Sequence, residues 1–465
     1  MTRLRRGLVG WRWLWAATVG VCACCGGGSD GSTGTWPDEG ALACEAPPCH
    51  FLLATASLDD RIEVFEIAGT PEYRATVDFD LDPNPGGDYS EDRLDEPYEA
   101  AVLGGDLVVP VGHFPARNAG SVAFLPLALL ADLDVGGHLP ADAYFDGADG
   151  IGGAVLAPAG AQEAIFTTPV AEGLLVTAVE NDLFAAEDTW TRAGAALLLA
   201  AGERGEIPAP RPLDDLPEGA CAAAGESVLI DERTVAVACD GNEAVAFYER
   251  DGDDLAPLAL CNLPPASGAR VRYLAADGGA AYVAESPTTA SPDPARLWRL
   301  DPTCSLGAVA DVMPAAAGTL TDVAAVPGAV LVAGTLGRRG IHPVRTSDGA
   351  PETCPPLAGL DELWVGADGR DLEPVALAAL PDGTRLAVAV GPFLPAPDDP
   401  GYGRIYVVDL VPGACGPEVA GVVDLTDGGP GHAAAVTPAD PSTYRRMAGP
   451  LTVHTVEAAD LDRAP

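Results

Sequence analysis

The stretch PVALAALPDGTRLAVAVGPFLPAPDDPGYGRIYVVDLVPGACG (Pro374–Gly416) decides the fold that we expect for this chain. It holds an apolar run, a Pro-Asp-Gly turn, a second apolar run (TRLAVAV) and, after a loop, a third (GRIYVVDL). An Asp-Gly turn between two apolar runs is a strong signal for a β-hairpin. The stretch therefore predicts three consecutive strands, of which the first two form a hairpin.

Weaker versions of this three-strand unit recur along the chain. A shorter copy over His50–Ile67 has only the second and third strands. Complete copies begin near Tyr98, Thr168, Glu226, Arg272 and Leu320. Most successive onsets lie close to the blade lengths of propeller repeats, about 40–50 residues. The longest gap needs an insertion, which the segment Leu139–Gly153 can supply.

Seven copies of a strand-rich unit predict an all-β fold, a seven-bladed β-propeller. The Pro-Asp-Gly unit followed by GRIYVVDL resembles the repeat of bacterial YVTN-type surface propellers, relatives of WD40, although the Trp-Asp signature of WD40 is absent. The resemblance covers about residues 50–425, and we expect one propeller domain over residues 44–465. A pair of β-sandwiches or an open solenoid is the alternative architecture.

The C-terminal part offers two segments that could close the ring. The first copy lacks its opening strand, so its innermost place in the blade is vacant. Either His432–Pro438 or Leu451–Ala458 could pair there. A ring closed in this way would be a single domain held by its own two ends.

Residues 1–23 have the features of a secretory signal. An Arg-containing start is followed by the 11 uncharged residues Trp13–Ala23, which are too few to span a bilayer as a helix. The Gly- and Ser-rich residues 24–43 predict a flexible tether. An ordinary cleaved signal whose cysteines later oxidise is one interpretation.

A second interpretation comes from the sequence VCAC (residues 21–24), which resembles the lipobox of bacterial lipoproteins. The resemblance implies cleavage after Ala23 and lipidation of Cys24. It also implies an anchor at the bacterial cell envelope, with the protein facing the periplasm or the cell surface. We favour this second interpretation, because the Gly/Ser tail that follows also fits it.

The charge of the chain limits its partners. The formal net charge is −42, and the sequence contains no Lys. A chain this acidic repels phosphate backbones, so we expect no nucleic-acid partner. It also repels anionic lipid surfaces, so membrane attachment must come from the lipid anchor. An envelope protein or another cationic ligand is the partner that the charge favours.

Eight cysteines lie outside the signal, an even number that predicts up to four disulfides in an exported chain. We expect Cys221 and Cys239 to pair within one blade, and Cys44 and Cys49 to close a small local loop. We place four others in the turn after the third strand of a copy, where they would staple the outer rim within their own blade or to an extended loop: Cys261, Cys304, Cys354 and Cys415.

Few residues suggest chemistry. Motifs of serine hydrolases, zinc peptidases, P-loops and dinucleotide-binding folds are absent. The six His are scattered, and we expect them to lie at the surface or to cap strands. One acidic segment has the spacing of a calcium-binding loop, with the candidate ligands Asp80, Asp82, Asn84 and Glu91. It carries Pro85 at the position where that loop needs Gly. We therefore favour a solvated loop, and a calcium site is the weaker interpretation. No other cofactor is predicted.

Three functional hypotheses follow. The first is a lipid-anchored extracytoplasmic binding or scaffold module, whose contact surface we place on the loops Asp78–Glu96, Leu139–Gly153 and Leu394–Tyr402. The second is a propeller enzyme, a lactonase-like hydrolase or quinoprotein-like dehydrogenase with a metal at the propeller axis. The third is a structural envelope protein without a specific ligand. We favour the first, because nothing in the sequence gathers the acids that an enzyme would need.

Overall fold

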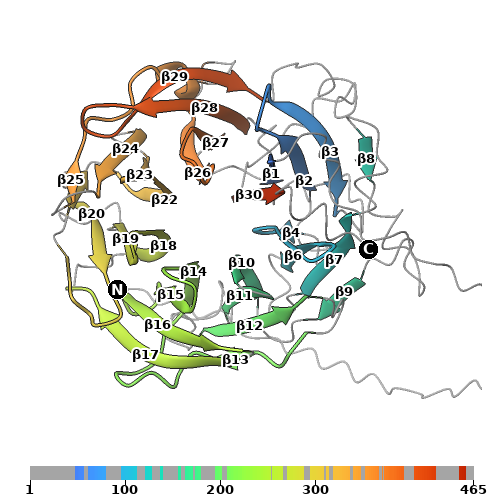
Figure 1. Cartoon of the computed structure of the whole chain (residues 1–465), viewed down its shortest axis with the longest axis vertical. Helices are drawn as coiled ribbons and strands as arrows, with labels where there is room; N and C mark the ends of the chain where they lie inside the picture. The colour runs from blue at the N-terminus through green and yellow to red at the C-terminus, as the bar shows by residue number, and fades with distance from the viewer. Residues whose placement is uncertain are drawn as a thin grey trace, which may run out of the picture. The chain divides into compact units, whose positions relative to one another are not determined.

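The described part of the chain is built from strands that form seven sheets around a common centre (Figure 1). The computed structural model describes residues 48–56, 61–79, 96–112, 121–127, 137–139, 155–158, 163–170, 173–179, 194–201, 207–252, 254–264, 270–286, 294–307, 310–313, 318–335, 339–346, 351–365, 369, 371–391, 403–425 and 450–456. Each sheet is one blade, and the blades follow the order of the sequence. The protein is a seven-bladed β-propeller, which confirms the fold predicted from the repeats.

Blade 1 joins the two ends of the described chain. From the centre outward it contains β30 (Leu451–Val456), β1 (Cys49–Ala56), β2 (Arg61–Glu66), β3 (Glu72–Asp78) and β8 (Gly137–Leu139). β30 pairs antiparallel with β1, from Cys49 opposite Val456 to Ala54 opposite Leu451. Of the two predicted closing segments, Leu451–Ala458 is therefore the one that closes the ring. The other, His432–Pro438, lies outside the described residues.

The remaining blades follow the same plan. Blade 2 has β4 (Glu96–Pro97) and β5 (Ala101–Leu103) innermost, both paired with β6 (Asp106–Gly112), and then β7 (Ser121–Pro126) and β9 (Val155–Pro158). Blade 3 contains β10 (Glu163–Val170), β11 (Gly173–Val179), β12 (Ala195–Ala200) and β13 (Arg211–Pro212). Blade 4 contains β14 (Ala224–Leu229), β15 (Thr234–Cys239), β16 (Ala244–Asp251) and β17 (Asp254–Asn262).

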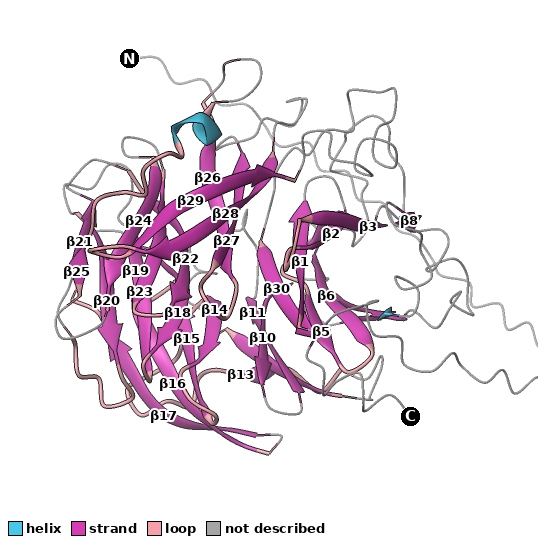
Figure 2. Cartoon of the chain, turned by 45° about the horizontal axis from the view of Figure 1, so that its top comes forward, coloured by secondary structure: helices cyan, strands magenta, loops and turns pink. Residues whose placement is uncertain are grey.

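Blades 5 to 7 complete the ring. Blade 5 contains β18 (Arg270–Asp277), β19 (Ala280–Ser286), β20 (Ala295–Leu300) and β21 (Ala310–Met313). Blade 6 contains β22 (Leu320–Val326), β23 (Ala329–Gly334), β24 (Gly340–Arg345) and β25 (Glu352–Thr353), followed by the helical turn η6 (Asp361–Trp364) (Figure 2). Blade 7 contains β26 (Glu373–Ala379), β27 (Arg385–Gly391), β28 (Arg404–Pro412) and β29 (Pro417–Asp424).

The hydrophobic core is divided into seven clusters, one between each pair of neighbouring blades. The strands alternate their side chains between two faces, so each apolar blade contributes to the clusters on both of its sides. Between blades 7 and 1, for example, Leu52 and Phe65 pack with Ile405 and Leu451. Among the described residues, no helix has the length and hydropathy that crossing a membrane would need.

Candidate functional site

Several residues singled out from the sequence lie outside the described residues. They are Cys24 and Cys44 and the weak calcium candidates Asp80, Asp82, Asn84 and Glu91. Most of the three proposed contact loops lies there as well. Within the described ranges, no group of three or more His, Cys, Asp or Glu residues is arranged to hold a metal ion.

Two histidines correct the expectation that all six lie at the surface or cap strands. His342 lies within β24 and is 2% exposed, so it belongs to the interior of blade 6. His50 on β1 is also buried, and its Nδ1 shares a hydrogen bond of 2.9 Å with the Thr455 hydroxyl on β30. Both therefore serve the packing of strands, and His50 contributes to the closure of the ring.

The disulfides confirm one predicted pair and correct two. Cys221 and Cys239 are joined at the start of blade 4, as expected. Cys261 pairs with Cys304, and Cys354 pairs with Cys415, and both bonds join neighbouring blades rather than one blade or a loop. These pairings arise because only two of the four cysteines lie where we expected them. Cys304 and Cys415 do follow the third strand of their blades, but Cys261 lies on the outermost strand β17 and Cys354 directly follows the outermost strand β25.

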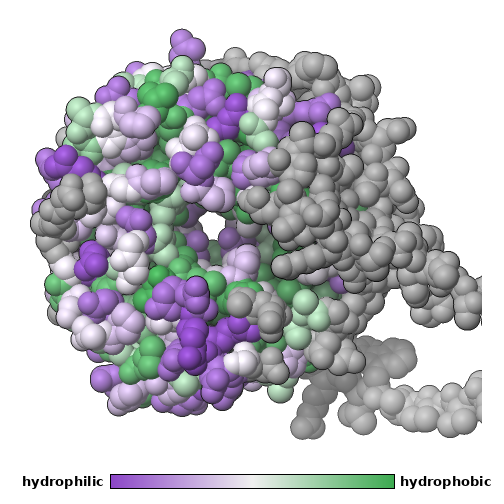
Figure 3. Space-filling view, viewed as in Figure 1, coloured by the Kyte–Doolittle hydropathy of each residue, from purple (hydrophilic) through white to green (hydrophobic). Residues whose placement is uncertain are grey.

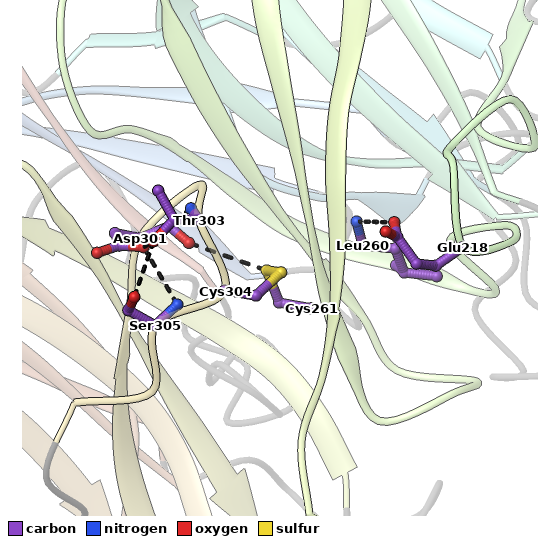
Figure 4. Close-up of a disulfide and its surroundings, with 7 residues drawn as sticks. All are labelled: Glu218, Leu260, Cys261, Asp301, Thr303, Cys304 and Ser305. Atoms are coloured by element: carbon purple, nitrogen blue, oxygen red, sulfur yellow. Dashed lines mark hydrogen bonds between the residues drawn. A yellow bond between two sulfur atoms is a disulfide. The ribbon is translucent and has the colours of Figure 1, made fainter.

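Each of these two bonds thus ties the turn of one blade to the outer strand of the blade before it. Figure 4 shows the Cys261–Cys304 bond at the rim. The Asp301 carboxylate accepts hydrogen bonds from the Thr303 hydroxyl and main chain and from the Ser305 main chain, which shapes the turn that carries Cys304. These hydrogen bonds, that of the Thr303 hydroxyl above all, lower the pKa of Asp301.

The most distinctive part of the propeller is a layer of its innermost strands. In blades 3 to 7 the pairing between the innermost and second strands shifts register at the same height, which marks a bulge. In blade 2 the innermost strand is broken at that height, between β4 and β5. Bulges re-aim side chains, so this layer presents different side chains to the centre than a regular strand would.

The residues at this height alternate in chemistry from blade to blade. In each of these blades the residue lies four positions before the last residue that pairs across the hairpin. That last residue ends the first strand in blades 2, 3, 5 and 6, and it directly follows the strand, as Ile230 or Leu380, in blades 4 and 7. In order from blade 2 to blade 7 they are Glu99, Phe166, Glu226, Tyr273, Asp322 and Ala376. Blades 2, 4 and 6 thus carry acids, and blades 3 and 5 carry aromatic rings.

Each acid of this layer holds the next blade. The main-chain N–H of Thr167 donates to Glu99 over 2.7 Å, that of Leu274 to Glu226 over 2.7 Å, and that of Leu377 to Asp322 over 2.6 Å. The three carboxyls therefore bridge blades 2 to 3, 4 to 5 and 6 to 7. We call Glu99, Glu226 and Asp322 the carboxyl layer.

Burial makes the carboxyl layer hard to ionise. It raises the pKa of Glu99 from 4.5 to about 8 and that of Asp322 from 3.8 to about 7, against the opposing effect of their main-chain hydrogen bonds. Burial also raises the pKa of Glu226 well above 4.5, and the charges of Asp322 and Glu99 raise it further. The charge of Asp322 also raises the pKa of Glu99, so the ionisation of Asp322 affects both glutamates of the layer.

The guanidinium group of Arg272 faces this layer. The Arg272 guanidinium carbon lies 5.3 Å from the centroid of the Phe166 ring and 6.0 Å from that of the Tyr273 ring, and the two rings meet edge to face. Its charge lowers the pKa of Glu226 and so partly offsets the effect of burial. We call the two rings, Phe166 and Tyr273, the cation cage, which the Arg272 guanidinium occupies.

The sequence analysis did not identify this layer. Its acids are separated by dozens of residues and share no motif, and Glu226 and Arg272 were noted only as the starts of repeats. A usable signal was present, because counting back from each hairpin turn brings the six positions into line. A space-filling view down the ring shows an opening at its centre (Figure 3). A cage of two rings and carboxyls beside such an opening can bind an organic cation.

Comparisons with known proteins support the fold. No family model matches the sequence, and no curated protein was found to be a relative. A solved structure from Bacteroides uniformis, provisionally assigned as a 6-phosphogluconolactonase, matches with a TM-score of 0.50 at 11% identity, over 82% of this chain and 97% of that one. A prolyl endopeptidase structure matches with a TM-score of 0.41 at 15% identity over 78% of this chain, which spans about half (48%) of that one. At such identities the likeness is one of fold.

Proposed function

We propose that this chain is a lipid-anchored binding module of the bacterial cell envelope, and that its propeller receives a cationic partner. In this proposal Cys24 carries the lipid, residues 24–43 are the tether and the propeller lies outside the cytoplasm. The sequence supports the anchor through the short apolar segment and the VCAC stretch at its end. Two or more acyl chains hold a protein on a membrane stably.

The observation that carries the binding role is the excess of carboxyl groups over cationic groups around the centre of the ring. The carboxyl layer supplies three carboxyl groups, and Arg272 is the cation that faces them. Burial opposes ionisation of these acids, and a cation brought to them would favour it. The whole chain, with a formal net charge of −42, attracts cations from a distance and repels anions.

A propeller enzyme, a lactonase-like hydrolase or a quinoprotein-like dehydrogenase, is the alternative. The likeness to a protein provisionally assigned as a 6-phosphogluconolactonase concerns the fold, and one fold hosts many unrelated functions. The proposed metal at the axis would need converging ligands, and the described residues offer no such group. The binding module is therefore the function that the site supports better.

The anchor is tested by lipid labelling. We would express the full chain and the variant Cys24→Ser in a bacterial host with a radiolabelled fatty acid. We expect label and membrane association in the parent chain and neither in the variant. Label that persists in the variant would contradict the assignment of Cys24.

The binding role is tested with a labelled arginine-rich peptide and the full chain in detergent. We expect a variant with Glu99→Gln, Glu226→Gln and Asp322→Asn to weaken binding by about tenfold or more, because removing one partner of a buried charge pair costs more affinity than removing a charge at the rim. The matched control changes three well-exposed acids, Asp251, Asp254 and Asp371, to Asn. Equal losses in the two variants, measured by fluorescence anisotropy, would show non-specific attraction of the peptide and contradict its binding at the carboxyl layer.

A further inference from the structure

The cation cage has an unusual occupant. Arg272 belongs to the bulge of β18 in blade 5, yet its guanidinium lies against Phe166 of blade 3, across the innermost strand of blade 4. We propose that Phe166, Tyr273 and Glu226 form a binding site for a guanidinium or alkylammonium group, and that Arg272 fills this site until such a ligand takes its place. This inference rests on the proposed function and specifies its ligand class and its site.

The backbone of blade 4 is shaped for this crossing. A Cβ on Gly225 would lie 2.8 Å from the main-chain oxygen of Arg272, closer than real Cβ contacts come, and 3.2 Å from its Cα, a tight contact. The Gly225 carbonyl in turn accepts a hydrogen bond of 2.7 Å from the Thr177 hydroxyl of blade 3. Three blades therefore meet at Gly225, and the bulge that carries Arg272 rests directly on it.

The guanidinium of Arg272 is held weakly. Among the described residues it makes neither an ion pair nor a hydrogen bond, in contrast to Arg385 and Arg404, which bind Asp409 and Asp424. What holds it is the faces of the two rings, with Glu226 near enough for its pKa to be lowered by the guanidinium charge. Its side chain is half-buried, so the group can leave the cage without unfolding a strand. An internal cation held in this way can be exchanged for an external one.

The chemistry of the site selects an organic cation. Aromatic faces attract cations that shed their water easily, and a guanidinium is more weakly hydrated than a compact ammonium. A metal ion would need converging oxygen or nitrogen ligands instead, and the described residues form no such group. The ligand that fits is a guanidinium group, or an alkylammonium group second, on a small molecule or on a side chain of a partner.

The test removes the internal occupant and supplies a free one. We would titrate methylguanidinium into the full chain in detergent and into the variant Arg272→Ala, and measure heat by calorimetry. A tethered side chain competes at an effective concentration of about a millimolar or more, so we expect the variant to bind methylguanidinium about tenfold or more tightly than the parent chain does. Binding should saturate at one molecule per chain.

Two further variants make the result specific. Adding Phe166→Leu to Arg272→Ala removes one ring and should abolish the gained binding of methylguanidinium. The control Arg296→Ala removes the ion pair with Asp311 elsewhere in blade 5, and it should bind methylguanidinium as the parent chain does. If Arg272→Ala does not fold, Arg272→Gln serves in its place, with circular dichroism as the check.

Absence of saturable binding in the folded variant, or equal affinity in variant and parent, would overturn the inference. A gain that survives Phe166→Leu would overturn the role of the rings. These outcomes are separate from those of the proposed function. Methylguanidinium could bind to Arg272→Ala while the arginine-rich peptide binds equally weakly to the carboxyl-layer variant and to the control with three exposed acids replaced. That result would support the cage and contradict binding of the peptide at the carboxyl layer.

Discussion

At the scale of single residues, the contact between Gly225 and Arg272 gives the first prediction. We expect Gly225→Ala to destabilise the folded protein by about 1–3 kcal/mol, since the added methyl group would press on a main-chain atom that cannot move alone. The matched control is Gly391→Ala, because a Cβ at Gly391 meets nothing within 4 Å. Urea unfolding of both variants checks this, and equal stabilities would show that the bulge yields without cost.

The carboxyl layer gives a prediction about pH. The folded protein keeps protons on Glu99 up to about pH 8, whereas in the unfolded chain this group loses its proton near pH 4.5. The folded state thus binds more protons than the unfolded state over this interval, and the free energy of unfolding falls as the pH rises through it. We expect the melting temperature to drop between pH 5 and pH 9, and the drop to shrink in Glu99→Gln.

The matched control for this pH series is Asp254→Asn, which removes an exposed acid. It should leave the slope of melting temperature against pH unchanged. A parent protein that becomes more stable towards pH 9 would contradict the raised pKa of Glu99, as would a Glu99→Gln variant with the slope of the parent.

At the scale of the element, β30 gives the third prediction. Leu451 is buried between blades 7 and 1, and it lies opposite Ala54 in the pairing that closes the ring. We expect Leu451→Asp to cost about 3 kcal/mol or more, because it places a charge in an apolar cluster. The control Val423→Asp, on the exposed outer strand β29, should change stability by less than about 0.5 kcal/mol. Denaturant melts of the two variants measure the difference, and similar losses would contradict a closing role for β30.

The elements also show how far the sequence could be interpreted. Hairpins such as that over Pro374–Gly391 could be predicted, because strand alternation and turn residues are local properties. The missing innermost strand of blade 1 could be predicted too, because the first copy of the repeat has only the second and third strands of the unit. The bulges at Glu226 and Arg272 could not, because a bulge depends on pairing between strands and leaves no local mark in the residues. Because the bulges could not be predicted, the sequence did not show that the acids and the aromatic rings lie in one layer.

At the scale of the whole molecule, neighbouring blades are bound in two different ways. Blades 4 and 5, and likewise blades 6 and 7, are joined twice, by a carboxyl of the layer near the centre and by a disulfide at the rim. Blades 3 and 4 are joined by hydroxyl groups instead, as where Thr168 donates to the Ser227 carbonyl. The ring therefore consists in part of reinforced pairs of blades.

The disulfides give the fourth prediction. Replacing both Cys354 and Cys415 by Ser opens a loop of 61 residues, whereas replacing Cys221 and Cys239 opens one of only 18. Chain entropy then predicts a loss of about 4 kcal/mol in the first case and about 3 kcal/mol in the second. Denaturant melts under non-reducing conditions test the order. The reverse order would mean that the bonds act on the folded state rather than on the unfolded chain.

The closure of blade 1 also means that β1 must wait for its inner partner strand while the polypeptide is synthesised. β1 and β2 leave the ribosome almost 400 residues before β30, which at about 5–20 residues per second is a delay of roughly 20–80 s. During this interval the inner edge of β1, a strand with apolar residues such as Leu52, is unpaired, and other strands can add to it. The nascent chain is therefore exposed to edge-to-edge association until β30 pairs with β1.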